Sequence, residues 1–99
     1  MNMQQLMLQA QKMQKAMAKA KEELANKSFS VSKGGAFTIT MKGDRTIEKI
    51  EIDEDALDKE NKEMLEEMIA LAIEEVLEKI QEEEAKITQG AAGGLGLGF

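Results

Sequence analysis

Residues 28–52 read SFSVSKGGAFTITMKGDRTIEKIEI, a stretch in which apolar and polar side chains alternate over short runs. Alternation with a period of two is typical of a strand that buries one face. Turn residues at Gly34-Gly35 and Gly43-Asp44 divide the stretch into three strands. The expected strands cover residues 28–32, 37–42 and 45–52. The stretch therefore predicts a three-stranded antiparallel meander.

The lengths of the two turns decide which side chains share a face of this sheet. A three-residue first loop beginning at Lys33 pairs Val31 with Phe37 and keeps the apolar residues of both strands together. A two-residue loop would place them on opposite faces. A two-residue second turn puts Ile50 opposite the same Phe37 and leaves Ile47 on the far face. We therefore expect one apolar face, with Ile47 outside it.

Long amphipathic helices are predicted on both sides of the meander. Residues 3–25 repeat apolar side chains at alternating intervals of three and four, which indicates a helix with one apolar seam. After the strands, Asp58 is a candidate N-cap for a second helix that reaches about Thr88. Its apolar surface, widened by Leu71, is broader than one sheet face requires, so we expect a partner helix. The seam residues expected in a core or dimer contact are Met3, Leu6, Met13, Met17, Leu24 and Leu71.

Length and composition limit the kind of protein this is. The 99 residues predict a single domain at residues 1–89 and a flexible Gly-rich tail at residues 90–99. Such a domain buries only about two thirds of the surface of its unfolded chain, so we expect a second subunit to add stability. No run of about 18 apolar residues and no signal segment is present, which predicts a soluble, cytoplasmic protein that does not bind membranes.

The residue types also restrict the chemistry. The chain has no Cys and no His, which excludes disulfides, thiolate nucleophiles and histidine-based catalysis. It contains no phosphate-binding loop and no dinucleotide fingerprint, so we expect no enzyme activity, no cofactor and no small-molecule substrate. Glu63, Glu67 and Glu74 share one side of the second helix, but their spacing is that of a solvated face, and we expect no metal site.

Charge is distributed unevenly along the chain. Residues 1–50 hold nine Lys and Arg against four Asp and Glu, a net charge of +5, whereas residues 51–99 hold four against fifteen, a net charge of −11. The two halves add up to −6. Any contact with a polyanion such as DNA is therefore expected to be local and oriented.

The first helix carries the candidate site for such a contact. Lys12, Lys15 and Lys19 fall within roughly 60° of each other, opposite the apolar seam. With Gln5 and Gln9 on the same helix, they are candidates for contacts with a nucleic-acid backbone. The alternative is an ordinary solvated helix face, which composition alone favours. Arg45 and Lys49 lie on or beside the hairpins and are candidates for a second basic patch.

The chain resembles the YbaB/EbfC family of bacterial nucleoid-associated proteins along essentially its full length. The resemblance rests on QAQKMQ at residues 9–14, IEID at residues 50–53, KEMLEE at residues 62–67 and a Gly-rich tail ending in Phe99. It implies an α/β (α+β) domain that forms a symmetric homodimer, with helices projecting from a sheet-based centre to hold double-stranded DNA. It further implies a nucleoid protein that influences transcription without enzymatic activity. Under this resemblance, Lys12, Lys15 and Lys19 are the expected phosphate contacts, and Arg45 and Lys49 are weaker candidates.

A different function remains open at this point. Two long helices that bracket β-hairpins are also similar to prefoldin subunits, whose coiled-coil arms grip unfolded chains. The regular seam of the first helix fits a chaperone or protein-interaction module of that kind. A membrane-surface helix is disfavoured because the seam contains neither Trp nor Phe.

Overall fold

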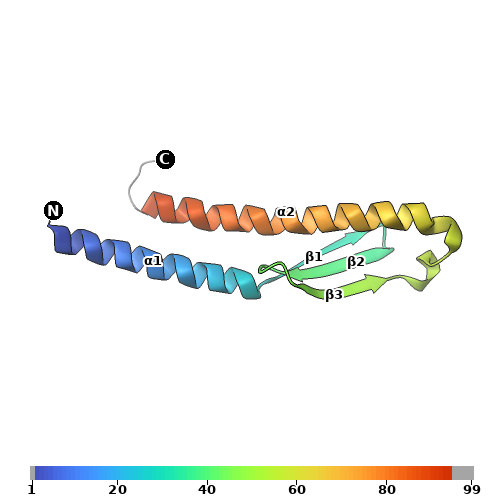
Figure 1. Ribbon diagram of the computed structural model, residues 1–99, viewed down its shortest axis with the longest axis horizontal. Coiled ribbons are helices and arrows are strands. Elements are labelled where there is room, and N and C mark those ends of the chain that lie inside the picture. The colour runs from blue at the N-terminus through green and yellow to red at the C-terminus, as the bar shows by residue number, and fades with distance from the viewer. Residues whose placement is uncertain (1, 95–99) are drawn as a thin grey trace.

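The computed structural model describes residues 2–94, which form two helices and one three-stranded antiparallel sheet (Figure 1). Helix α1 (Met3–Asn26) leads into strands β1 (Ser28–Lys33), β2 (Phe37–Lys42) and β3 (Ile47–Ile52). Two short 3-10 turns, η1 (Glu54–Ala56) and η2 (Lys59–Asn61), connect the sheet to helix α2 (Lys62–Gly94). The predicted order of helix, meander and helix is confirmed.

Side-chain caps mark the starts of helix α1 and of turn η2. The side chain of Asn2 accepts a hydrogen bond from the N–H of Gln5 at 2.8 Å and so caps α1. Asp58, the predicted N-cap of the second helix, caps η2 instead by accepting from the N–H of Glu60 at 3.2 Å. Helix α2 continues past the predicted end near Thr88 and includes residues 90–94, which the sequence places in the tail. The last tail residues, 95–99, lie outside the described residues.

The first hairpin has the predicted parity but a different register. Val31 lies opposite Ile39 rather than opposite Phe37, so the pairing is displaced by two residues from the prediction. The loop begins one residue later than predicted, because Gly34 and Gly35 both adopt left-handed backbone, with φ of 59° and 67°. Glycine takes this conformation without strain. The three-residue length still keeps the apolar side chains of both strands on one face.

The second hairpin corrects the expectation for Ile47. Its turn has three residues rather than two, because Arg45, predicted to start the strand, adopts left-handed backbone with φ of 69°. The longer turn brings Ile47 opposite Met41 on the apolar face, so its predicted place on the far face is wrong. A β-bulge then adds one residue to β3 and restores the alternation. Ile50 therefore shares this face as predicted, although not opposite Phe37.

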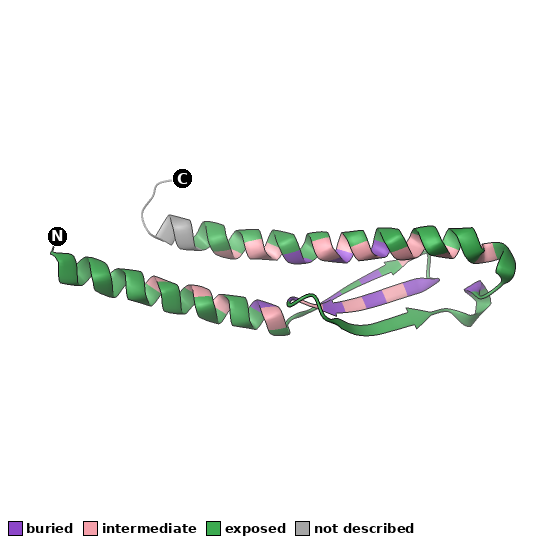
Figure 2. Cartoon of the chain, viewed as in Figure 1, coloured by how far each residue is buried: buried purple, intermediate pink, exposed green. Residues whose placement is uncertain are grey.

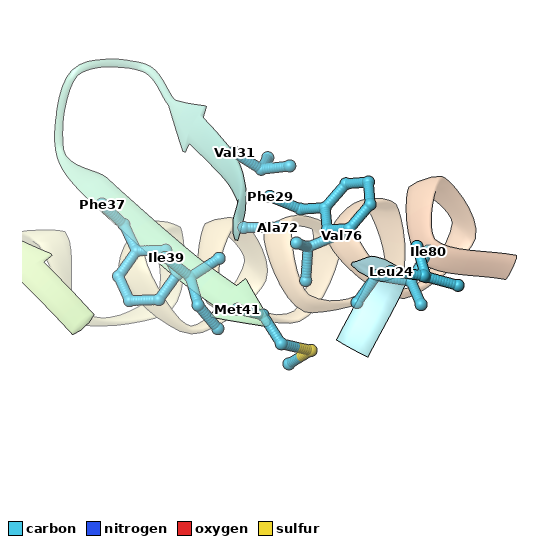
Figure 3. Close-up of a cluster of buried hydrophobic side chains, with 9 residues drawn as sticks. All are labelled: Leu24, Phe29, Val31, Phe37, Ile39, Met41, Ala72, Val76 and Ile80. Carbon is cyan, nitrogen blue, oxygen red and sulfur yellow. The ribbon is translucent and has the colours of Figure 1, made fainter. Parts of the chain in front are cut away.

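The hydrophobic core lies between α2 and the first two strands, as Figure 3 shows. Ile39 on the sheet and Val76 and Ile80 on α2 have no exposed surface. β3 is different, because all six of its residues are exposed (Figure 2). The buried cluster consists of Leu24, Phe29, Val31, Phe37, Ile39, Met41, Ala72, Val76 and Ile80. One edge of the sheet is thus left uncovered on its apolar face.

Both helices extend beyond the sheet in the same direction (Figure 1). The molecule measures 69 × 23 × 13 Å along its principal axes, and α1 forms a projecting arm along the first part of this length. Within residues 2–94, neither helix contains an apolar run long enough to cross a membrane. The candidate lysines on this arm therefore lie away from the hydrophobic core.

Candidate nucleic-acid interface

The basic stripe, defined as Lys12, Lys15 and Lys19, lies on the projecting part of α1. All three residues are exposed. None of the ion pairs formed among residues 2–94 involves any of them. Their ammonium groups are therefore not neutralised by the carboxylates of α2, although fifteen acidic residues lie in the second half of the chain. The stripe is available to an external anion.

The two candidate glutamines lie at the outer end of this stripe. Gln5, Leu8, Gln9 and Lys12 line a shallow surface hollow of about 380 Å³. The structure thus brings both predicted glutamines beside one of the predicted lysines. Leu8 was not among the predicted site residues, and its exposed side chain adds an apolar contact to a polar surface. The sequence could have indicated Leu8, because it lies four residues before Lys12 and therefore on the same side of the helix.

Arg45 and Lys49 do not join the stripe, because each is engaged elsewhere. The guanidinium of Arg45 donates two hydrogen bonds to the carboxylate of Glu84, at 2.7 and 3.2 Å. This bidentate pair raises the pKa of Arg45 and lowers the pKa of Glu84 from their ordinary values. Lys49 lies on β3, with its ammonium 3.2 Å from the carboxylate of Glu51. The basic stripe of α1 is therefore separate from both.

The chain matches a known protein family over almost its whole length. The model of the YbaB/EbfC DNA-binding family matches residues 1–95. This chain belongs to the YbaB/EbfC family. Two curated relatives of this chain are named nucleoid-associated protein. One from Ruminiclostridium cellulolyticum is 44% identical over 93% of this chain and 84% of its own length. One from Enterococcus faecalis is 41% identical over 93% of both chains.

A solved structure shares the fold of this chain. The crystal structure of an uncharacterized protein from Helicobacter pylori superposes with a TM-score of 0.74. The alignment covers 91% of this chain and 96% of that chain, at 20% sequence identity. The helix-meander-helix arrangement is thus shared by a chain of low sequence identity.

The apolar seam of this YbaB/EbfC chain is buried only toward the sheet. Leu24 belongs to the core, and Met13 and Met17 are half-buried. Met3 is 76% exposed, and Leu6 is exposed as well. The seam thus packs within the chain near the sheet and lies open at the N-terminal end of α1. Leu71, the seam residue predicted on the second helix, is exposed on α2.

A second apolar surface was not predicted. We define the β3 face as Ile47, Ile50 and Ile52, whose side chains are 55%, 51% and 41% exposed. They lie opposite buried residues of β2 and therefore point to the side of the sheet on which α2 packs. α2 covers β1 and β2 and leaves this face open. The sequence could not show this, because it does not reveal which strands a helix covers.

The outer side of α2 is acidic. Its exposed carboxylates include those of Glu63, Glu67, Glu74 and Glu78. Within residues 2–94, no group of three or more acidic side chains is arranged to hold a metal ion. These carboxylates repel a polyanion from this side of the molecule.

Proposed function

We propose that this chain binds double-stranded DNA as a homodimer, through phosphate contacts made by Lys12, Lys15 and Lys19. The observation that carries the proposal is the exposure of all three ammonium groups on a projecting helix, without carboxylate partners among residues 2–94. Lysines are point-charge ligands for phosphates, and such contacts provide most of the affinity in sequence-independent binding. Membership of a DNA-binding family supports the choice of partner.

The charge distribution supports an oriented mode of binding. DNA approaching the α1 side meets the basic stripe, whereas DNA approaching the outer side of α2 meets a row of carboxylates. Contacts are therefore confined to the arm, and Gln5 and Gln9 lie within it as hydrogen-bonding partners. The proposed site of action is the nucleoid, where the protein organises the chromosome and influences gene expression. The nucleoid-associated names of its relatives agree with that location.

The β3 face supports a symmetric dimer. Three half-exposed isoleucines on an edge strand form an apolar surface of the type that proteins cover with another chain. A two-fold contact uses the same surface on both subunits, and a row of isoleucines is self-complementary. The face lies on the sheet rather than on the arm, so the contact leaves both basic stripes free to bind one duplex.

The test compares a variant that lacks the positive charges of the stripe with a matched control variant. The first variant combines Lys12→Gln, Lys15→Gln and Lys19→Gln. The control combines Lys59→Gln, Lys62→Gln and Lys79→Gln, which removes the same charge from exposed residues outside α1. Fluorescence anisotropy with a labelled duplex should show at least ten-fold weaker binding by the first variant and a much smaller change in the control. Equal effects of the two variants would overturn the proposed site.

The outer end of α1 favours a chaperone-like module as a second candidate. Met3, Leu6, Met7 and Leu8 are all exposed there, within two turns of helix. Exposed apolar side chains of this kind bind unfolded chains. A light-scattering assay of aggregation suppression without DNA tests this function. If the protein does not slow the aggregation of a client, this candidate is excluded.

A further inference from the structure

Helix α1 is attached to the rest of the protein at one end only. Along the apolar seam, Leu24 is buried near the C-terminal end of α1, Met13 and Met17 are half-buried, and Met3 and Leu6 are exposed. The direction of the whole arm therefore depends on a small set of contacts. We call this set the α1 root and define it as Leu24, Lys27 and the turn Gly43–Arg45, together with Glu83 and Glu84 of α2.

The turn between β2 and β3 presses against the end of α1. The N–H of Gly43 donates a hydrogen bond to the carbonyl of Lys27 at 2.9 Å. A Cβ at Gly43 would collide with the carbonyl oxygen of Leu24, so only glycine fits here without a shift of the backbone. The turn is thus fixed to α1 by main-chain contacts, and any group that holds the turn also holds the arm.

Arg45 links this turn to α2. Its two hydrogen bonds to Glu84 are matched on the other side of the root by Lys27, whose ammonium lies 3.4 Å from the carboxylate of Glu83. Arg45 also adopts left-handed backbone, which residues with a side chain rarely do. Two consecutive carboxylates of α2 therefore hold the turn and the end of α1 in place.

The Arg45–Glu84 pair borders a hollow in the protein surface. A hollow of about 490 Å³ lies between α1, the turn and α2, and its lining includes Lys21, Arg45, Glu84 and Thr88. Packed side chains do not fill this space. On this side the Arg45–Glu84 pair, rather than packed side chains, joins the turn to α2.

We propose that Arg45 is a positioning residue that sets the direction of the α1 arm through Glu84, and that it does not itself bind phosphate. This inference rests on the proposed function, because it assigns Arg45 a role in presenting Lys12, Lys15 and Lys19 to DNA. The arm extends about 30 Å from the root, at 1.5 Å per residue. Lys12 lies about 18 Å from Leu24 along this arm, so a rotation of about 10° at the root displaces Lys12 by about 3 Å, close to the roughly 3.4 Å rise per nucleotide of a DNA strand.

The test follows the arm directly and then its effect on DNA. The chain has no Cys, so Gln11→Cys on α1 and Gln89→Cys on α2 provide two unique spin-label sites on exposed residues. Double electron–electron resonance, with labelled protein diluted in unlabelled protein, then reports the distance within one protomer. Arg45→Gln should broaden or shift this distance distribution and weaken DNA binding at least five-fold. Exchange of the pair, Arg45→Glu with Glu84→Arg, should restore both toward the wild-type values.

Two controls separate positioning from direct contact. Lys33→Gln removes the same charge and breaks an ion pair with Glu75, which links β1 to α2 without involving α1. It should leave the distance distribution and the affinity nearly unchanged. A phosphate contact by Arg45 in each subunit would instead leave the distances of Arg45→Gln unchanged and lower the salt slope of binding by about 1.8, without rescue by the exchanged pair. That result would overturn the inference.

The two proposals fail in different ways. If the protein does not bind duplex DNA, or binds equally well without the three lysines, the proposed function is wrong, and the spin-label distances still show whether Arg45 directs the arm. If DNA binding depends on those lysines while Arg45→Gln leaves the distances unchanged, the positioning role is wrong and the proposed function stands.

Discussion

Gly43 lies directly against the main-chain carbonyl of Leu24, at the point where the β2–β3 turn meets the end of α1. The obstacle to a larger residue is backbone, which cannot rotate away as a flexible side chain can. Gly43→Ala must therefore displace the turn or the helix end. We expect it to lower the free energy of unfolding by about 1–3 kcal/mol, as overpacking usually does. Urea unfolding at a fixed protein concentration measures the change.

Gly90 provides the matched control for this substitution. A Cβ there meets nothing within 4 Å, and the residue lies within α2. Because alanine is favoured over glycine in a helix by about 1 kcal/mol, Gly90→Ala should leave the stability unchanged or raise it. An unfolding midpoint of Gly43→Ala equal to that of the wild type would show that the close approach at the root is absent.

The titration of Glu84 reports on its pair with Arg45. Two hydrogen bonds from the guanidinium lower the pKa of this carboxyl from its ordinary value of 4.5. A lowered pKa in the folded state means that the pair stabilises the fold above the ordinary pKa, and that this contribution is lost as the pH falls through the lowered value. Arg45→Gln should raise the pKa of Glu84 toward its ordinary value. Carbon-13 NMR of the side-chain carboxyl groups follows the change.

Glu75 serves as the internal reference in the same spectra. A hydrogen bond from Lys33 lowers the pKa of Glu75, and this pair does not involve Arg45. Its titration should therefore be the same in the wild type and in Arg45→Gln. A Glu84 carboxyl that titrates identically in both proteins would mean that the Arg45–Glu84 pair does not form in solution.

The sequence predicts strand identity and parity better than it predicts register. Alternation in the segment around Phe37 is enough to place its apolar residues on one face. Register depends on the backbone conformation of single turn residues, and nothing in the sequence indicates that Arg45 adopts left-handed φ. That one angle lengthens the turn and moves Ile47 to the apolar face. The uncovered β3 face follows only from the position of α2 in three dimensions.

The candidate site, like the fold, could be predicted from the sequence only in part. Helical periodicity alone places Lys12, Lys15 and Lys19 on one side of α1, because a regular helix fixes the angle between its residues. The engagement of Arg45 by Glu84 joins residues 39 positions apart and depends on how the turn packs against α2. No local pattern carries that information. The basic stripe could therefore be predicted from local structure, whereas the partner of Arg45 could be identified only from the three-dimensional fold.

DNA binding by the basic stripe should depend steeply on salt. Three lysines from each of two subunits make about six phosphate contacts, so log K should fall against log salt with a slope near −5. Anisotropy titrations across a series of salt concentrations give this slope. The variant with Lys12, Lys15 and Lys19 all changed to Gln should show a much shallower dependence. A nearly flat slope for the wild type would mean that phosphate contacts do not provide the affinity.

Ile50→Glu should weaken the proposed dimer without unfolding the protomer. The side chain of Ile50 is already 51% exposed in the single chain, so a carboxylate there remains hydrated in the monomer and is buried without a partner in the dimer. Sedimentation equilibrium should show at least a ten-fold increase in the dissociation constant. Lys49→Gln is the control, because it lowers the charge of the chain by the same amount at the residue before Ile50. The side chain of Lys49 points to the other face of the sheet. Unchanged association of Ile50→Glu would exclude the β3 face as the contact between subunits.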